Sequence, residues 1–209
     1  MYKITIACII SIILTSCDRH QNENNGVTER LESITGDSNA FSDSVINRSF
    51  VAENGERFLR FEIEIDTPVT EVWKSIATED GIKTWMVPVA KVDLKTGGTV
   101  VTNYTATAKI GDEGTIPLGI INYIPNEMLI YKITLNNVFP KKCRDEDSNL
   151  QEIIQLKPLE KNKTKVVSTM VGWGQGKEWD NTYRFFEKGN KWSYQQLLNR
   201  FRNGPAKWN

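Results

Sequence analysis

The segment from about residue 177 to residue 202 constrains the fold most strongly, because its apolar residues recur every three or four positions. This spacing predicts a long helix with one apolar face, and that face needs a cover supplied by the rest of the chain. The stripe consists of Trp179, Tyr183, Phe186, Tyr194, Leu197, Leu198 and Phe201. Gly189 and Asn190 interrupt it and are candidates for a bend or a break.

The segment before this helix alternates in the manner of strands. Residues 58–65 place apolar side chains on one side and charged ones on the other, which predicts a strand with one buried face. Thr67 and Pro68 then resemble a helix start, with a hydroxyl N-cap and proline at the first position, and Thr78 can cap a second short helix.

Further strands are predicted at 89–94, 99–105, 115–123, 129–135, 150–156 and 165–173. Pro117 makes the third of these an edge strand or a bulged strand, because proline cannot donate a ladder hydrogen bond. The order predicts an α+β domain, with a curved antiparallel sheet wrapped around the long C-terminal helix and two short helices after the first strand.

The N-terminus carries an export signal. Lys3 precedes an apolar run over residues 4–14, which is shorter than the roughly 20 residues of a membrane-spanning helix and suits a secretory signal. The run ends in Leu14-Thr15-Ser16-Cys17, which resembles the lipobox of bacterial lipoproteins. The resemblance implies cleavage before Cys17 and a lipid (palmitate among its acyl chains) on that thiol, in the inner or outer membrane of a bacterial envelope. An ordinary secretory signal is the alternative.

The domain boundaries follow from composition. Residues 18–43 are rich in Asn, Asp, Glu, Ser and Gly, so they bury too little apolar surface to offset the entropy of ordering. We therefore expect a signal peptide over 1–16, a flexible tether over 17–49 and one folded domain over 50–209, which lies outside the cytoplasm.

Several classes of function find no support in the composition. Lys plus Arg and Asp plus Glu both number 26, without a basic cluster, which argues against nucleic-acid binding. The single histidine, His20, lies in the tether, so the domain lacks the imidazole of histidine zinc sites and catalytic triads. We expect no metal and no cofactor. Cys143 is the one thiol that processing leaves free, and its charged surroundings indicate an incidental loop cysteine rather than a reactive one.

Several short motifs together resemble the START-like (SRPBCC) superfamily, whose architecture is the helix-grip fold, and within it the homologues of the activator of the large heat-shock-protein ATPase. These motifs are Ile65-Asp66-Thr67-Pro68, Val72-Trp73, Trp85, Pro88, Leu94, Gly97-Gly98, Gly114, Pro125-Asn126-Glu127, Gly172-Trp173, Trp179 and Trp192. The resemblance implies a site for hydrophobic molecules between sheet and helix, although some members are enzymes. The activator serves a cytosolic chaperone, whereas the export signal predicts that this chain leaves the cytoplasm, so the activator's role does not follow from the resemblance.

The first functional hypothesis is therefore a module that binds a lipid or another hydrophobic small molecule. Tyrosine and tryptophan combine an apolar body with a polar tip, which suits such a pocket. The candidate lining is Trp85, Tyr104, Tyr131, Trp173, Trp179, Tyr183 and Phe186. The alternative is that these side chains only fill the core, and a cavity of about 300 Å³ or more under the helix would favour binding.

Two further hypotheses stay open. The charged segment 136–149 is a candidate surface for an envelope protein-interaction module of the co-chaperone type, with a solvated loop as the alternative. An enzyme would have to use Glu178, Asp180, Tyr183 or Arg184 near the helix start, where carboxylates also stabilise the helix dipole. The sequence gives catalysis little support.

Overall fold

The structure is a computed structural model that describes residues 45–208 of the 209-residue chain. The predicted signal peptide, the lipidation site Cys17 and the tether up to residue 44 lie outside the described residues. The first described strand, Ile46–Asn47, falls within the range predicted for the tether.

One antiparallel sheet forms the framework of the domain. Along the sheet the strands follow the order β1-β3-β9-β8-β7-β6-β5-β4, and β2 pairs separately with β3. The strands are β1 (Ile46–Asn47), β2 (Phe50–Val51), β3 (Arg57–Ile65), β4 (Val89–Asp93), β5 (Thr99–Asn103), β6 (Ile116–Ile124), β7 (Met128–Ile133), β8 (Gln151–Glu160) and β9 (Lys163–Val171).

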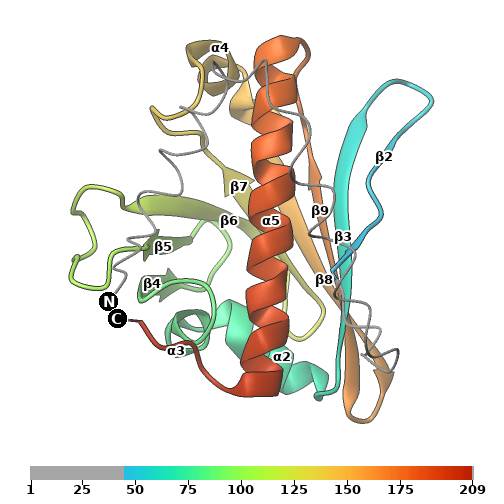
Figure 1. Cartoon of the computed structure of the whole chain (residues 1–209), viewed down its shortest axis with the longest axis vertical. Coiled ribbons are helices and arrows are strands. Elements are labelled where there is room, and N and C mark those ends of the chain that lie inside the picture. Colours follow the sequence, from blue (N-terminus) through green and yellow to red (C-terminus); the bar gives the residue numbers. More distant parts are fainter. Residues whose placement is uncertain (1–44, 209) are drawn as a thin grey trace, which may run out of the picture. The chain divides into compact units, whose positions relative to one another are not determined.

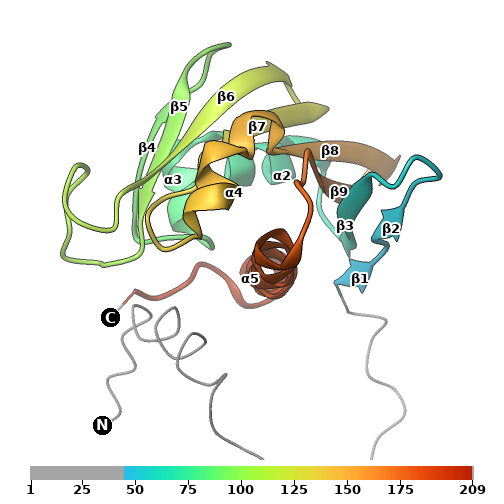
Figure 2. The ribbon, with the colours of Figure 1, turned by 90° about the horizontal axis from the view of Figure 1, so that it is seen from above.

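Helices lie at the connections and at the end of the chain. They are α2 (Val69–Ala77), α3 (Glu79–Lys83), α4 (Lys141–Asp145), the 3-10 helix η2 (Asp147–Asn149) and α5 (Lys177–Asn203). In Figure 1, α5 runs along the sheet over most of the length of the domain. Figure 2 looks along α5 and shows the sheet as an arc, with β3 and β9 near the helix and β4 to β6 curving away. This is the α+β helix-grip architecture that the sequence predicts.

The buried side chains form one core between the sheet, α2, α3 and α5. Strand β3 contributes Leu59, Phe61, Ile63 and Ile65, all at most 2% exposed, as its alternation predicts. Helix α5 contributes Trp179 and Leu197 with no exposed surface. The stripe of the terminal helix therefore packs on the apolar face of the sheet.

Two local predictions are corrected, and a third is confirmed in one of its alternatives. Pro68 rather than Thr67 occupies the N-cap of α2, and the Thr67 hydroxyl donates to the carbonyl of Asp66. Strand β6 is internal and bulged, the second of the two alternatives for a strand with Pro117; the bulge lies beyond Ile120, and the pairing with β7 stops at Leu118, before the proline. Helix α5 continues through Gly189 without a break, because packing on both sides of the glycine outweighs its low helix propensity.

Candidate functional site

The centre of the sheet's inner face contains one carboxylate. Because paired residues of antiparallel strands point to the same face, a lateral row crosses the sheet from β3 to β6. This row consists of Leu59, Met170, Glu152, Tyr131 and Ile120. The other four side chains are at most 2% exposed, whereas Glu152 stays partly exposed. A carboxyl thus faces α5 from the middle of an apolar surface.

Two hydroxyl groups hold one oxygen of this carboxyl. Ser168 on β9 donates to Glu152 Oε1 at 2.6 Å, and Tyr194 on α5 donates to the same oxygen at 2.8 Å. Both donors are buried, at 1% and 4% exposure. Burial raises the pKa of the Glu152 carboxyl above its ordinary value, and the two hydrogen bonds oppose that rise. Among residues 45–208, no group bonds to Oε2.

Two of the tyrosines predicted to line the ligand site lie close enough to Glu152 for its charge to affect their pKa. Burial, and secondarily the carboxylate, raises the pKa of Tyr131 and of Tyr104. The Tyr131 hydroxyl donates to the carbonyl of Ile76 at 3.4 Å. The Tyr104 hydroxyl has no hydrogen-bond partner within the described part of the chain, and its side chain is partly exposed. The site therefore contains two polar atoms, Glu152 Oε2 and Tyr104 Oη, that lack partners in the described part of the chain.

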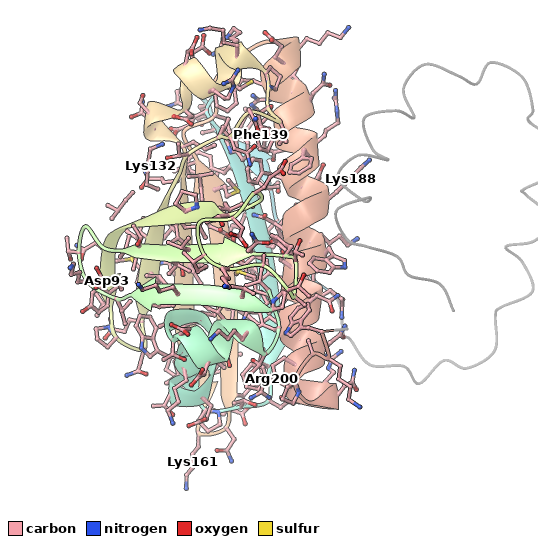
Figure 3. All side chains as sticks on the ribbon, turned by 90° about the vertical axis from the view of Figure 1, so that its left-hand side faces the viewer. Asp93, Lys132, Phe139, Lys161, Lys188 and Arg200 are labelled. Atoms are coloured by element: carbon pink, nitrogen blue, oxygen red, sulfur yellow. The ribbon has the colours of Figure 1, made fainter. Side chains whose placement is uncertain are left out.

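The middle of α5 leaves this region loosely covered. All of α5 is described, and none of its residues between Thr182 and Tyr194 is buried. In this stretch Asn190 points toward the sheet, because its Nδ2 lies 3.1 Å from the sulfur of Met170. Lys188 points away from the domain body (Figure 3). Tyr194, at the end of this stretch, is buried and donates to Glu152, which itself stays partly exposed.

The other predicted aromatic residues gather at the start of α5. The ring centroid of Trp173 lies 4.9 Å from that of Tyr183, 5.7 Å from that of Phe186 and 6.3 Å from that of Trp179. Phe139, which the sequence analysis missed and which Figure 3 labels near α5, stacks on Phe186 at 5.5 Å. This aromatic cluster occupies one end of the space between the sheet and α5.

The chain before α5 is shaped to admit these rings. A Cβ at Gly174 would lie 2.1 Å from Nε1 of Trp179, so only glycine allows the indole to pack there. The indole nitrogen of Trp179 donates to Glu146 Oε2 at 2.8 Å. Arg57 NH1 donates to Asp180 at 2.7 Å, and its guanidinium lies 5.2 Å from the centroid of the Tyr183 ring. The last predicted lining residue, Trp85, is in the core beside α2 and donates to the carbonyl of Ser75 at 2.8 Å.

An open hollow of about 430 Å³ lies where β8 begins and β9 ends. Of the predicted ligand-binding residues, Trp173 alone lines it. Its other lining residues are Glu56, Glu146, Asn149, Gln151, Val171, Gly172 and Gly174. Gln151 and Val171 pair on the face of the sheet opposite Glu152, so this hollow is not the space beneath the middle of α5.

The residues proposed for catalysis do not converge. Glu178 and Arg184 are exposed, and Asp180 is engaged by Arg57. Among the described residues, no three His, Cys, Asp or Glu side chains are grouped as metal ligands would be. Within the same residues, no helix is both long enough and apolar enough to cross a membrane.

The structure corrects the expected loop around Cys143, because the segment 136–149 contains α4 and η2. The pairs Lys141–Asp145 and Lys142–Glu146, four residues apart, stabilise α4. Cys143 is fully buried on the inward side of this helix and accepts a hydrogen bond from Thr182 at 3.4 Å. It is therefore a packed core thiol rather than a loop thiol.

Comparison with known proteins agrees with this architecture. Residues 66–201 match the family described as activator of Hsp90 ATPase homolog 1-like protein. None of the curated proteins matches the chain.

Solved structures with the same fold come from several bacteria. The Aha1 dimer from Colwellia psychrerythraea is 17% identical, with a TM-score of 0.57, over 71% of this chain and 98% of that one. A conserved protein of unknown function from Enterococcus faecalis is 12% identical, with a TM-score of 0.56, over 77% and 81%. CalU16 from Micromonospora echinospora is 15% identical, with a TM-score of 0.55, over 80% and 88%. At these identities the similarity shows the fold alone.

Proposed function

Because the chain belongs to the family of activator of Hsp90 ATPase homolog 1-like proteins, we propose that its domain binds a small, largely apolar molecule between the sheet and α5. The observation that carries this proposal is that Glu152, at the centre of the inner face, is partly exposed. A side chain in the middle of an apolar core is normally apolar, or fully buried if it is polar. Glu152 is polar and partly exposed, and the α5 residues between Thr182 and its buried partner Tyr194 are not buried.

The surroundings suit a ligand with an apolar body and a polar end. The inner face around Glu152 is formed by aliphatic side chains and tyrosines, and the aromatic cluster lies toward the start of α5. Glu152 Oε2 and the Tyr104 hydroxyl are free to make the few directed hydrogen bonds that fix a ligand's orientation. Both atoms lack partners among residues 45–208 and belong to partly exposed residues.

Native mass spectrometry of the full chain purified from bacteria tests this proposal. We expect a bound small molecule on the wild type and its loss in Asn190→Trp, because a large side chain in place of the amide near Met170 would fill the space. Lys191→Trp adds the same indole at the adjacent, exposed position and should retain the ligand. Circular dichroism would confirm that both variants are folded. Protein that is empty in every preparation, or equal occupancy in both variants, would refute the proposal.

We further propose that a lipid on Cys17 anchors the chain to a bacterial membrane, with the domain outside the cytoplasm. The support is the apolar run over residues 4–14 and the Leu14-Thr15-Ser16-Cys17 motif. Metabolic labelling with palmitate tests it: the wild type should be labelled and found with membranes, and Cys17→Ser should be unlabelled. A Cys8→Ser control should keep the label. Equal labelling of wild type and Cys17→Ser would contradict the anchor.

A further inference from the structure

We infer that the ligand carries a protonated amine, which forms an ion pair with Glu152 Oε2 beneath α5. This inference rests on the proposed function and specifies the chemical class of the ligand. It starts from the distribution of charge on the inner face of the sheet. Glu152 is at the centre of that face, in a row whose other members are apolar side chains and Tyr131.

Arg57, a positively charged side chain on the same face of the sheet, already has hydrogen-bond partners. Arg57 is the other charged residue that the strand register places on the inner face of β3, β9, β8 or β7. It donates to Asp180 at 2.7 Å and to the carbonyl of Gly174 at 2.6 Å. Strand β9 separates its strand from β8. Glu152 therefore has no protein cation as a partner within residues 45–208.

The hydrogen bonds of Glu152 leave one oxygen for a ligand. Ser168 and Tyr194 both donate to Oε1, so they occupy the acceptor sites of that oxygen. Oε2 accepts no hydrogen bond from residues 45–208. The hydroxyl of Tyr104, in the same region, also has no partner among these residues. A ligand ammonium group has three N–H donors, so it can donate to Glu152 Oε2 and to the Tyr104 hydroxyl oxygen.

Electrostatics select an amine over an acid. An ionised carboxylate in an apolar interior is unfavourable unless it is paired and hydrogen-bonded, and burial accordingly raises the pKa of Glu152. The titratable groups that face it are tyrosines: Tyr194 from α5, Tyr131 from β7 and Tyr104 after β5. None of them supplies positive charge. A ligand carboxylate would add a second negative charge here, whereas an ammonium group neutralises the first.

Three probes with the same chain length test the inference: dodecylamine, dodecanol and dodecanoate, each titrated calorimetrically below its micelle concentration into the full chain. A hydrogen-bonded charge pair corresponds to an affinity ratio of about tenfold or more, so we expect the amine to bind at least about tenfold tighter than the other two. Glu152→Gln keeps the shape and removes the charge, and it should abolish this preference. Glu64→Gln removes an outer-face carboxylate that is paired with Lys163, and it should leave the preference intact.

The pH profile of the wild type provides a second readout that needs no variant. Because burial raises the pKa of Glu152, amine affinity should rise with pH as this carboxyl ionises, while dodecanol affinity should not. Binding of all three probes without preference for the amine, or a preference that survives Glu152→Gln, would overturn the inference and leave the proposed function standing. Failure of every probe to bind would overturn both.

Discussion

Replacing Gly174 with alanine should destabilise the domain strongly, because the new methyl group has no room. A Cβ at this position would lie 2.1 Å from Nε1, 2.5 Å from Cε2 and 2.6 Å from Cδ1 of Trp179. The Trp179 indole has no exposed surface and is fixed by its hydrogen bond to Glu146 and by Trp173. Overpacking of this kind costs about 1–3 kcal/mol, which for a domain of this size lowers the Tm by about 3–10 °C.

The same substitution at Gly189 is the matched control. A Cβ there meets no atom within 4 Å, and the residue is in the exposed middle of α5. Alanine is the better helix former by about 1 kcal/mol, so Gly189→Ala should raise the Tm. Thermal melts followed by tryptophan fluorescence and circular dichroism measure both. Equal Tm values for Gly174→Ala and the wild type would refute the packing of Trp179 against this backbone.

Three further predictions concern single side chains. The pKa of Glu152 is raised in the folded state, so the unfolded chain ionises more readily and the wild type loses stability as the pH rises from about 4 through the folded-state pKa. Urea unfolding should show this loss in the wild type and not in Glu152→Gln. Parallel pH profiles for the two proteins would contradict the prediction. Thr78→Ala should cost about 1 kcal/mol because the Thr78 hydroxyl caps Gly81 N at 3.0 Å, whereas Thr67→Ala, which removes no cap, should cost much less; equal losses in urea titrations would be the opposing result. Cys143 should react with a thiol reagent only upon unfolding, and rapid labelling of the native chain, located by peptide mapping, would show that α4 opens.

Much of the framework could be predicted because the patterns were local. The alternation of residues 58–65 gave the buried face of β3, and the three- and four-residue spacing of Tyr194, Leu197 and Leu198 gave the packed face of α5. Thr78 acts as the predicted cap because its position requires nothing beyond the adjacent turn. In each case the sequence neighbours alone determine which side chains share a face.

Glu152 was missed because β8 lacks a clean alternation near its start. Gln151 and Glu152 are adjacent and both polar, so neither face is marked as buried there. The signal lies two and four residues later: Ile154 and Leu156 are buried, and a period of two places Glu152 on their side. Its partners Ser168 and Tyr194 come from β9 and α5, and such long-range contacts have no signature in a local pattern.

Helix α4 was missed for a different reason. Its charged composition is typical of a loop, but Pro140 at the N-cap and the two lysine–carboxylate pairs four residues apart are helix signals. The burial of Cys143 depends on contact with α5, and the sequence around the cysteine does not reveal that contact.

The central claim is that a molecule binds next to Glu152 beneath α5, and a crystal structure of the full chain with dodecylamine tests it most directly. We predict density for the alkyl chain between the sheet and α5, with the amine nitrogen within hydrogen-bond distance of Glu152 Oε2. Density only in the open hollow lined by Glu56 and Trp173, or an interior filled by protein side chains alone, would contradict this claim.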